Sequence, residues 1–178
     1  MEERLERVLN RVIDWVKYEE AKNAALVTLD GVGFGVIAAS SSPSPWLKGS
    51  QVIFLISLMI ASYSFHPVVK NDKLHKNAVR RRKRSQRILS NSHLLFFADI
   101  AGSDPVAYLN EFRLAVGETS GITVLELDYA REIVTNAEIA VQKLRLFEAG
   151  LLVSVLAFIL ATIATLVAAV SSGQVKGF

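Results

Sequence analysis

The run AGLLVSVLAFILATIATLVAAV at residues 149–170 is apolar throughout, and no ionisable side chain follows it until Lys176. A helix needs about 20 predominantly apolar residues to cross the hydrocarbon core of a bilayer, so this run predicts a membrane span. Apolar residues at three- and four-residue spacing begin at about Thr123 and continue without Gly or Pro to Gly150. We therefore predict one long helix over 123–170, whose first half packs on the N-terminal helix and whose second half lies in lipid.

Two shorter apolar segments, at 24–41 and 51–65, predict a transmembrane hairpin. The turn-forming Ser-Ser-Pro-Ser-Pro-Trp at 41–46 joins them, and Trp46 suits the aromatic belt at a membrane interface. Residues 2–23 carry apolar side chains at helical spacing between charges, which predicts an amphipathic helix that runs directly into the first span. The predicted fold class is an all-α membrane protein.

These segments divide the chain into five parts. They are an amphipathic helix at 1–23, the hairpin at 24–67, a sensing and coupling region at 68–148, the third span at 149–171 and a tail at 172–178. Inside the coupling region we predict a loop at 70–80, a helix or linker at 80–92, and a helix at 105–116. Asp104 followed by Pro105 is a capping side chain before a first-turn proline, which is typical of a helix start.

Lysine and arginine side chains predict the orientation, because cytoplasmic ends of spans carry an excess of them. The segment after the second span carries nine, while the hairpin turn carries only Lys48. The nine are Lys70, Lys73, Lys76, Arg80, Arg81, Arg82, Lys83, Arg84 and Arg87. We expect the N-terminus and the region 67–148 to face the cytoplasm.

The composition leaves little room for catalysis. The 178-residue chain has no cysteine, so it offers neither a disulfide framework nor a thiolate that could bind a metal or act as a nucleophile. Its three histidines lack regular metal-ligand spacing, and no serine stands in a nucleophile elbow. We expect a protein that is not an enzyme, with no cofactor and no metal.

Asp30 is the first candidate functional residue, because an acid within a span is costly and generally faces protein or water. It can belong to a pore, a gate or a helix contact. Alternatively, it can snorkel to the cytoplasmic headgroups or pair with a cytoplasmic lysine such as Lys22. Gly31 and Gly35 form a small-xxx-small face, for which packing inside the hairpin and oligomerisation are both open.

The basic run at 80–84 has three readings. It can set topology and attract anionic lipid, at about 1 kcal/mol per basic residue near the surface. It can bind a phosphate-bearing ligand, because arginine offers paired donors to phosphate oxygens. Nucleic acid is the third reading, but no interleaved aromatic platform accompanies the run, so we expect no nucleic-acid partner.

The segment Phe96-Phe97-Ala98-Asp99-Ile100 is too short to span a membrane and belongs to the interior of the central region. Two aromatic rings and a carboxylate shortly before a helix N-terminus, which favours anions, also make it a candidate ligand site. Plain core packing and ligand binding are both open for this segment.

In order and spacing, these elements resemble the transmembrane effectors of Pycsar, the bacterial pyrimidine cyclase system of antiphage defence. The elements that carry the resemblance are Trp15 to Ala25 at the entry to the first span, Leu29-Asp30-Gly31, Phe97-Ala98-Asp99-Ile100, Tyr108-Leu109, and Asn136-Ala137 with Lys143. The run at 80–84 is heavier than the family pattern requires, and the middle segment diverges too far for a ligand site to be carried over.

The resemblance implies a multi-pass protein of the bacterial inner membrane whose partner cyclase makes cyclic CMP or cyclic UMP on infection. The effector would then impair the membrane and cause abortive infection, as a homo-oligomer in the lipid bilayer. As ligand-binding residues we predict Arg80, Arg81, Arg82, Phe96, Phe97, Asp99 and Tyr108, and as membrane and gating residues Asp30, Gly31, Gly35, Lys22 and Lys143. The alternatives are a membrane scaffold or accessory subunit, or an effector gated by a cyclic oligonucleotide.

Overall fold

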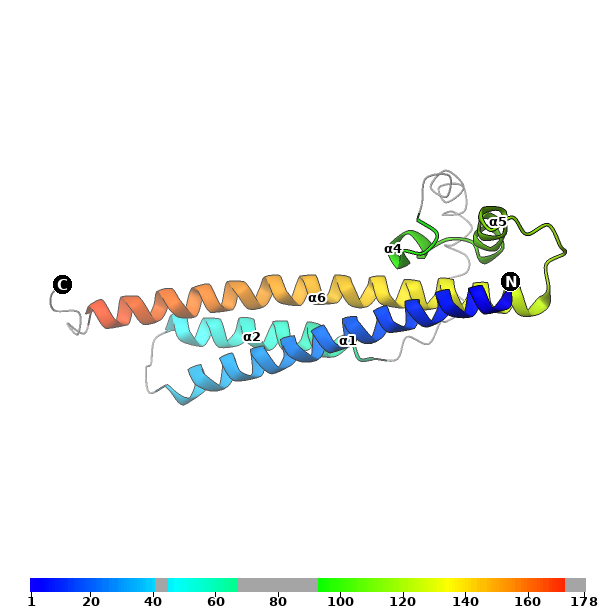
Figure 1. The fold of residues 1–178 in the computed structure, drawn as a ribbon. Coiled ribbons are helices and arrows are strands. Elements are labelled where there is room, and N and C mark those ends of the chain that lie inside the picture. The colour runs from blue at the N-terminus through cyan, green and yellow to red at the C-terminus, as the bar shows by residue number, and fades with distance from the viewer. Residues whose placement is uncertain (41–44, 67–92, 172–178) are drawn as a thin grey trace. The chain divides into compact units, whose positions relative to one another are not determined.

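The computed structural model describes residues 1–40, 45–66 and 93–171, and within these ranges the chain is helical and has no strand (Figure 1). The helices are α1 (Glu2–Ala39), α2 (Pro45–Tyr63), α4 (Phe97–Ile100), α5 (Pro105–Ala115) and α6 (Val124–Ser171). The predicted all-α fold is confirmed. Three of these helices, α1, α2 and α6, are long and apolar enough to cross a membrane, as a protein with three spans requires.

The chain forms two compact units. We call Met1–Glu19 with Pro67–Leu144 the head unit, and Glu20–His66 with Arg145–Phe178 the membrane unit. The helices α1 and α6 contribute residues to both units, since each is one continuous helix, of 38 and 48 residues. This confirms that the amphipathic N-terminal helix continues into the first span and that the last helix continues into the third.

The head unit has a conventional apolar core. The first part of α1 contributes aliphatic side chains, α4 and α5 contribute mainly aromatic ones, and α6 contributes small ones. The buried residues are Leu5, Val8, Leu9, Val12, Phe97, Ile100, Tyr108, Leu109, Phe112, Ala130, Ile133, Val134, Ala137 and Ala140. The predicted packing of the first half of α6 on the N-terminal helix is therefore present in this core.

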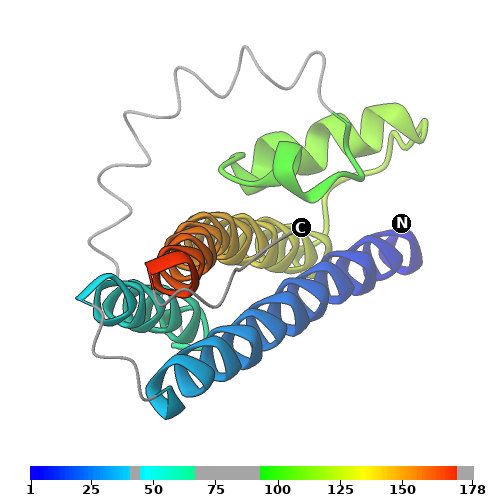
Figure 2. The same ribbon diagram turned by 90° about the vertical axis from the view of Figure 1, so that its left-hand side faces the viewer.

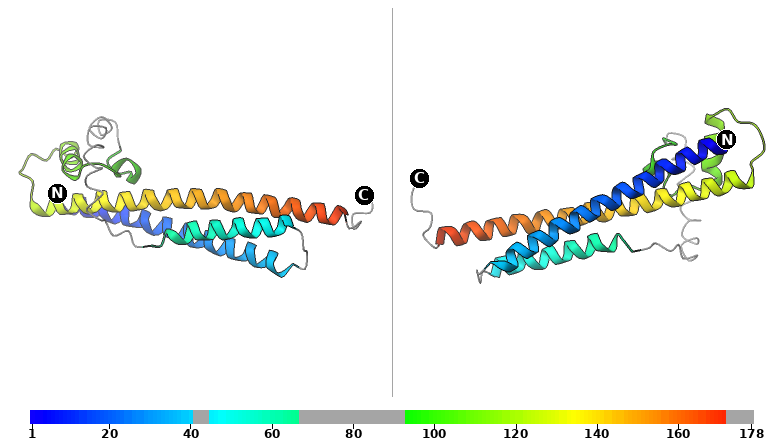
Figure 3. Two further views of the ribbon diagram at one scale, coloured as in Figure 1. Left: turned by 180° about the vertical axis from the view of Figure 1, so that it is seen from behind. Right: turned by 60° about the horizontal axis from the view of Figure 1, so that its bottom comes forward.

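In the membrane unit α2 lies alongside the second half of α6, and the second half of α1 completes a set of three helices (Figures 2 and 3). Large apolar side chains point outward from it, as lipid requires; they include Val32, Val36, Leu55, Met59, Leu152, Leu156, Ile163 and Val167. The interior holds many small and polar side chains beside the large apolar Leu26, Leu47 and Phe54. The buried serines Ser50 and Ser57 on α2 and Ser64 just after it recur every seven residues, the repeat of a coiled-coil seam.

Two close contacts fix how the three helices align. A Cβ placed on Gly33 would lie 2.8 Å from Cζ of Phe54 and 3.3 Å from Cζ of Phe158. A Cβ placed on Gly150 would lie 2.9 Å from Cδ2 of Leu26. Because Gly33 and Gly150 have no side chain, the helices can approach each other closely at these two positions. Close approach at small residues is the usual basis of packing between membrane spans.

The helix α2 begins earlier than its apolar segment predicts. The sequence places residues 42–50 in the hairpin turn, whereas the helix starts at Pro45. A proline is well tolerated in the first turn of a helix, because its missing N–H has no partner to lose there. Trp46 lies in this first turn and is exposed, as an interfacial side chain should be.

Candidate functional site

The polar contacts of the head unit concentrate where α5 ends and α6 begins. The start of α5 follows the predicted signal, because the Asp104 carboxylate accepts hydrogen bonds from the backbone N–H groups of Val106 and Ala107, at 3.0 and 3.2 Å. Its end is a Schellman motif: Gly117 has a φ of +71°, and Glu118 N–H donates to the Arg113 carbonyl. This motif ends α5 and turns the chain at Gly117.

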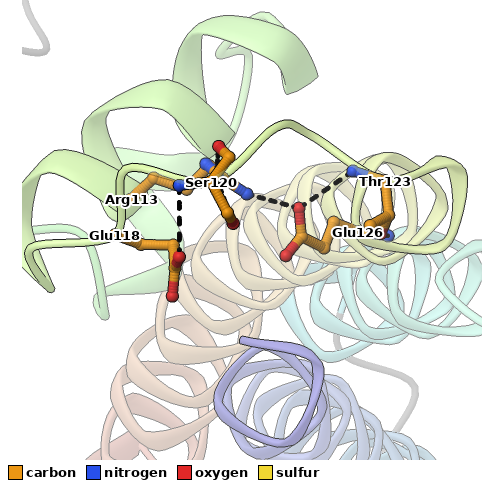
Figure 4. Close-up of polar contacts among 5 residues, drawn as sticks. All are labelled: Arg113, Glu118, Ser120, Thr123 and Glu126. Atoms are coloured by element: carbon orange, nitrogen blue, oxygen red, sulfur yellow. Dashed lines mark hydrogen bonds and ion pairs between the residues drawn. The ribbon is translucent and has the colours of Figure 1, made fainter.

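A capping box starts α6. The Thr123 hydroxyl accepts from the Glu126 N–H and the Glu126 carboxylate accepts from the Thr123 N–H, both at 3.1 Å. The same Glu126 oxygen accepts a hydrogen bond from Nη1 of Arg113 at 2.5 Å (Figure 4). Both side chains of this ion pair are 5% exposed, so it is a buried pair, which fixes the end of α5 to the first turn of α6.

The other terminal nitrogen of Arg113 binds the loop between the helices. Its Nη2 donates to the Ser120 carbonyl and, at 3.1 Å, to the Ser120 hydroxyl. The N–H of Ser120 donates to the Glu118 carboxylate at 3.3 Å. Hydrogen bonds from Ser120, side chain first and backbone second, lower the pKa of Glu118. We call Arg113, Glu118, Ser120, Thr123 and Glu126 the α5–α6 latch.

The structure places two predicted ligand residues, Phe97 and Tyr108, in the core of the head unit. The Tyr108 hydroxyl donates to the Leu94 carbonyl at 3.1 Å, and burial raises the pKa of Tyr108. Neither ring offers a face to solvent in this state. Their assignment to a ligand stays a prediction, and packing is the role the structure gives them.

The other two predicted residues of this segment are accessible. Phe96 is 43% exposed, and one oxygen of Asp99 accepts a hydrogen bond from the His93 N–H at 3.1 Å. Phe96 is also the exposed end of an aromatic row: its ring centroid is 5.0 Å from that of Phe97, which is 5.0 Å from that of Trp15. Phe96 is thus a partly exposed ring that contacts the buried core through Phe97. The predicted Arg80, Arg81 and Arg82 lie outside the described residues.

The predicted membrane residues divide by environment. Asp30 is fully buried in the membrane unit, and neither of its carboxylate oxygens has a hydrogen-bond partner among the described residues. Gly31 and Gly35 face outward, with nothing of the described chain within 4 Å of a Cβ placed on either. The glycine of this segment that packs against α2 is therefore Gly33, through Phe54.

The two predicted lysines also differ. The Nζ of Lys22 lies 5.2 Å from the ring centroid of Phe147, a cation–π contact within the membrane unit. Lys143 belongs to the head unit and is buried. The structure therefore brings Lys22 to an aromatic ring of α6 and gives no contact between Lys22 and Asp30.

The α5–α6 latch is not among the sites predicted from the sequence, although two signals for it are present there. Thr-x-x-Glu at 123–126 just before an apolar periodic run is a capping-box signature. Arg113 also interrupts an otherwise apolar face that includes Leu109 and Phe112. A lone arginine on a buried face requires an acidic partner, and Glu126 is the buried acid at the start of the next helix.

Comparison with known proteins gives one finding about the whole chain. A protein-family model described as the Pycsar effector protein domain matches residues 4–170. No curated protein and no solved structure matched in the same comparisons. The match covers both units, including the α5–α6 latch and the polar interior of the membrane unit.

Proposed function

The chain belongs to the Pycsar effector family, and on this premise we propose that it responds to a cyclic pyrimidine nucleotide and impairs the membrane that holds it. The nucleotide is cyclic CMP or cyclic UMP made by a partner pyrimidine cyclase, and the outcome is abortive infection. The single observation that carries this proposal is the family match over residues 4–170. The protein acts as a non-enzymatic effector in this scheme.

The charge distribution supports placement in the bacterial inner membrane with the head unit in the cytoplasm. The nine basic residues between Lys70 and Arg87 follow the second span, whereas residues 42–50, between the first two apolar segments, include only Lys48. Such an excess marks the cytoplasmic side. A nucleotide made in the cytoplasm would then meet the head unit directly.

Within the head unit we assign the nucleotide base to the Phe96 ring, which is 43% exposed. Stacking on an aromatic side chain is worth about 1–3 kcal/mol per base and is tolerant of base identity. The ring is held from behind by Phe97, so it is positioned before the ligand arrives. The buried rings of Phe97 and Tyr108 support this surface rather than form it.

The phosphate of the nucleotide is assigned to Arg80, Arg81 and Arg82 on chemical grounds. A cyclic nucleotide carries one phosphate charge, and arginine presents paired donors to phosphate oxygens. The same run can also attract anionic lipid. An exchange of these arginines for lysine separates the roles, because it keeps the charge and removes the paired donors.

A ligand shifts a conformational equilibrium only if it binds one state more tightly than the other. The helices α1 and α6 offer a route for such a shift, since each continues from the head unit into the membrane unit. The α5–α6 latch determines where α6 starts. Binding beside α4 and α5 would therefore act on the same helix that later crosses the membrane.

We propose that the active state is a homo-oligomer assembled through α1. Gly31 and Gly35 face away from the described chain, and Thr28 lies on the same exposed stretch of helix. Small side chains on the lipid side of a span permit close contact with another span. The outward position of these glycines supports oligomerisation over packing within the hairpin.

The test is a membrane-potential dye in bacteria that express this protein together with a pyrimidine cyclase. Depolarisation is expected with the active cyclase and is not expected with a catalytically inactive one. Separate cyclases for cyclic CMP and cyclic UMP identify the nucleotide. If the potential is unchanged with both nucleotides, although the protein is inserted in the membrane, the proposal fails and a scaffold role gains support.

The base site has a matched pair of variants. Phe96→Ala and Leu95→Ala remove neighbouring side chains that are 43% and 46% exposed. We expect Phe96→Ala to weaken nucleotide binding by about 5- to 150-fold, the equivalent of about 1–3 kcal/mol of stacking, and Leu95→Ala to leave it unchanged. Calorimetry on the purified protein measures both, and equal effects of the two variants would contradict the assignment of the base to Phe96.

A further inference from the structure

The interior of the membrane unit contains a level at which two buried polar groups lack partners. Leu26 of α1 and Gly150 of α6 are in contact, and so are Gly33 of α1 and Phe158 of α6. Both helices run in the same direction between these contacts. Asp30 lies four residues after Leu26, and Ser154 lies four residues after Gly150. Since both helices rise by about 1.5 Å per residue, Asp30 and Ser154 share one level.

Both residues of this level are buried and unsatisfied. Asp30 is 0% exposed and Ser154 is 1% exposed. Both carboxylate oxygens of Asp30 and the hydroxyl of Ser154 lack a hydrogen-bond partner in the described part of the chain. Buried polar groups in native proteins are nearly always paired, so these three atoms require an explanation.

Among the described residues, the neighbouring side chains supply no cation to this level. The buried side chains of α2 are Leu47, Ser50, Phe54, Ser57 and Ala61, and none of these carries a charge. On α6 the basic and acidic side chains nearest in sequence, Arg145 and Glu148, are exposed. On α1 Lys22 precedes Asp30 by eight residues, about 12 Å along the helix, and its Nζ lies over Phe147.

Toward the C-terminal end of α1, aromatic rings cover the level of Asp30 and Ser154. Phe54 and Phe158 pack edge to face, with centroids 4.7 Å apart, against Gly33. On the other side Leu26 contacts Gly150, whose carbonyl accepts a hydrogen bond from the Ser57 hydroxyl at 2.8 Å. Along α1, Asp30 is six residues from Ala24, where the predicted span begins, and nine residues from the helix end at Ala39, about 9 and 13 Å.

We propose that Asp30 and Ser154 form an intramembrane binding site for one small monovalent cation, a proton or an alkali-metal ion. An ionised carboxylate without a partner is too costly in a low-dielectric interior, so the carboxylate holds a compensating positive charge. One carboxylate balances one unit charge, and hard oxygen donors suit a proton or sodium. When this cation leaves, a bare carboxylate remains between three helices and destabilises their closed packing.

This inference concerns the resting protein and does not rest on the proposed response to a nucleotide. Its test uses the full-length protein in lipid vesicles without nucleotide. The melting temperature is measured over a pH series and over sodium and potassium series, for the wild type and for Asp30→Asn. The amide keeps the shape of the side chain and removes its charge. A failure of the nucleotide experiment would leave this measurement unaffected.

Other ionisable groups, Glu118 among them, make the melting temperature of both proteins depend on pH, so the quantity compared is the difference in melting temperature between the wild type and Asp30→Asn. This difference is expected to change with the cation. A change with pH at fixed sodium identifies a proton, and a change with sodium or potassium at fixed pH identifies a metal ion. The proposal is overturned if the two proteins respond alike to every series. Ser154→Ala should shift the cation midpoint by about tenfold through one lost oxygen contact.

The matched control is Ser50→Ala. Ser50 is equally buried, but its hydroxyl donates to the Leu47 carbonyl within α2. Its loss should leave the cation midpoint unchanged, and an equal shift in both serine variants would contradict the assigned site. If Asp30→Asn does not fold, the comparison of the two serine variants still decides the question.

Discussion

The two units of this protein solve the burial of polar groups in opposite ways. In the head unit the core is apolar, and its buried arginine, Arg113, is paired with Glu126 at 2.5 Å. In the membrane unit most large apolar side chains face outward, and the interior contains several serines and Asp30, whose carboxylate has no partner among the described residues.

The difference follows from the solvent of each unit. Water surrounds the head unit, so apolar burial stabilises it and an internal charge pair serves to hold two helix ends. Lipid is as apolar as leucine, so small side chains and close backbone approach hold the membrane unit together. The paired charges of Arg113 and Glu126 hold two helices together and so have a structural role. The carboxylate of Asp30 has no such partner among the described residues, which makes it the better candidate for a functional role.

Breaking the head-unit pair should have the largest effect. Arg113→Ala leaves Glu126 buried without its partner, which we expect to reduce the free energy of unfolding of the head unit by about 3–5 kcal/mol. The exposed pair of Arg131 and Asp128, at 2.9 Å, is the matched control on α6. Arg131→Ala should cost about 0–1 kcal/mol.

Denaturant unfolding followed by the fluorescence of Trp15 measures both variants. Trp15 packs against Phe97 in the head unit, and replacing Trp46, the other of the two tryptophans, by phenylalanine removes the signal of the membrane unit. Replacing the pair together by Met and Leu, at Arg113 and Glu126, should recover most of the stability. Equal costs for Arg113→Ala and Arg131→Ala would mean that the buried pair is not what joins the helices.

Crowding the membrane unit is the next largest change. Gly33→Ala places a methyl group 2.8 Å from Cζ of Phe54, whose ring is held by Phe158 and cannot move aside freely. Overpacking of this kind costs about 1–3 kcal/mol. Gly35→Ala is the control, because nothing described lies within 4 Å of its new methyl group.

Thermal unfolding in detergent compares these glycine variants. Gly33→Ala should melt below the wild type, and Gly35→Ala should melt at the temperature of the wild type. The double variant Gly33→Ala with Phe54→Leu should regain part of the loss, since the shorter side chain withdraws from the new methyl group. A lower melting temperature for Gly35→Ala than for Gly33→Ala would reverse the assignment of the packing glycine.

Much of the fold was accessible from the sequence because it depends on local periodicity. Apolar spacing predicted both long helices, α1 and α6, and the Asp104-Pro105 signal predicted α5. The start of α2 was not predicted, since the turn signal at 41–46 and a first-turn proline use the same residues. Composition alone does not distinguish these two uses of proline.

The details of the sites depend on contacts that local patterns do not contain. The pairing of Arg113 with Glu126 requires that two helix ends meet across a loop. The sequence shows glycines at 31, 33 and 35, but only the neighbouring helices decide that Gly33 packs inward. Likewise, the segment 96–100 reads as one aromatic cluster, while the fold buries Phe97 and leaves Phe96 exposed.

A smaller effect on stability is expected at Tyr108, and it tests whether this residue belongs to the core of the head unit or to the ligand site. Tyr108→Phe removes the hydroxyl that donates to the Leu94 carbonyl at 3.1 Å, and we expect a loss of about 1 kcal/mol in stability. Tyr63→Phe, at an exposed tyrosine of α2, should have no measurable effect. Calorimetry on Tyr108→Phe should also give an unchanged nucleotide affinity, and a weakened one would return Tyr108 to the ligand site.

The smallest predicted effect tests the loop of the α5–α6 latch through pH. Hydrogen bonds from Ser120 lower the pKa of Glu118, so the folded state favours the ionised carboxylate. The stability that this contact contributes is present above the unfolded pKa and is lost as pH falls through the lowered, folded value. In Ser120→Ala the side-chain hydrogen bond is absent, and the pKa of Glu118 should rise toward its ordinary value. Carbon-detected NMR titration of the Glu118 carboxyl measures this rise, and an unchanged pKa would show that Ser120 does not hold the carboxylate through its hydroxyl.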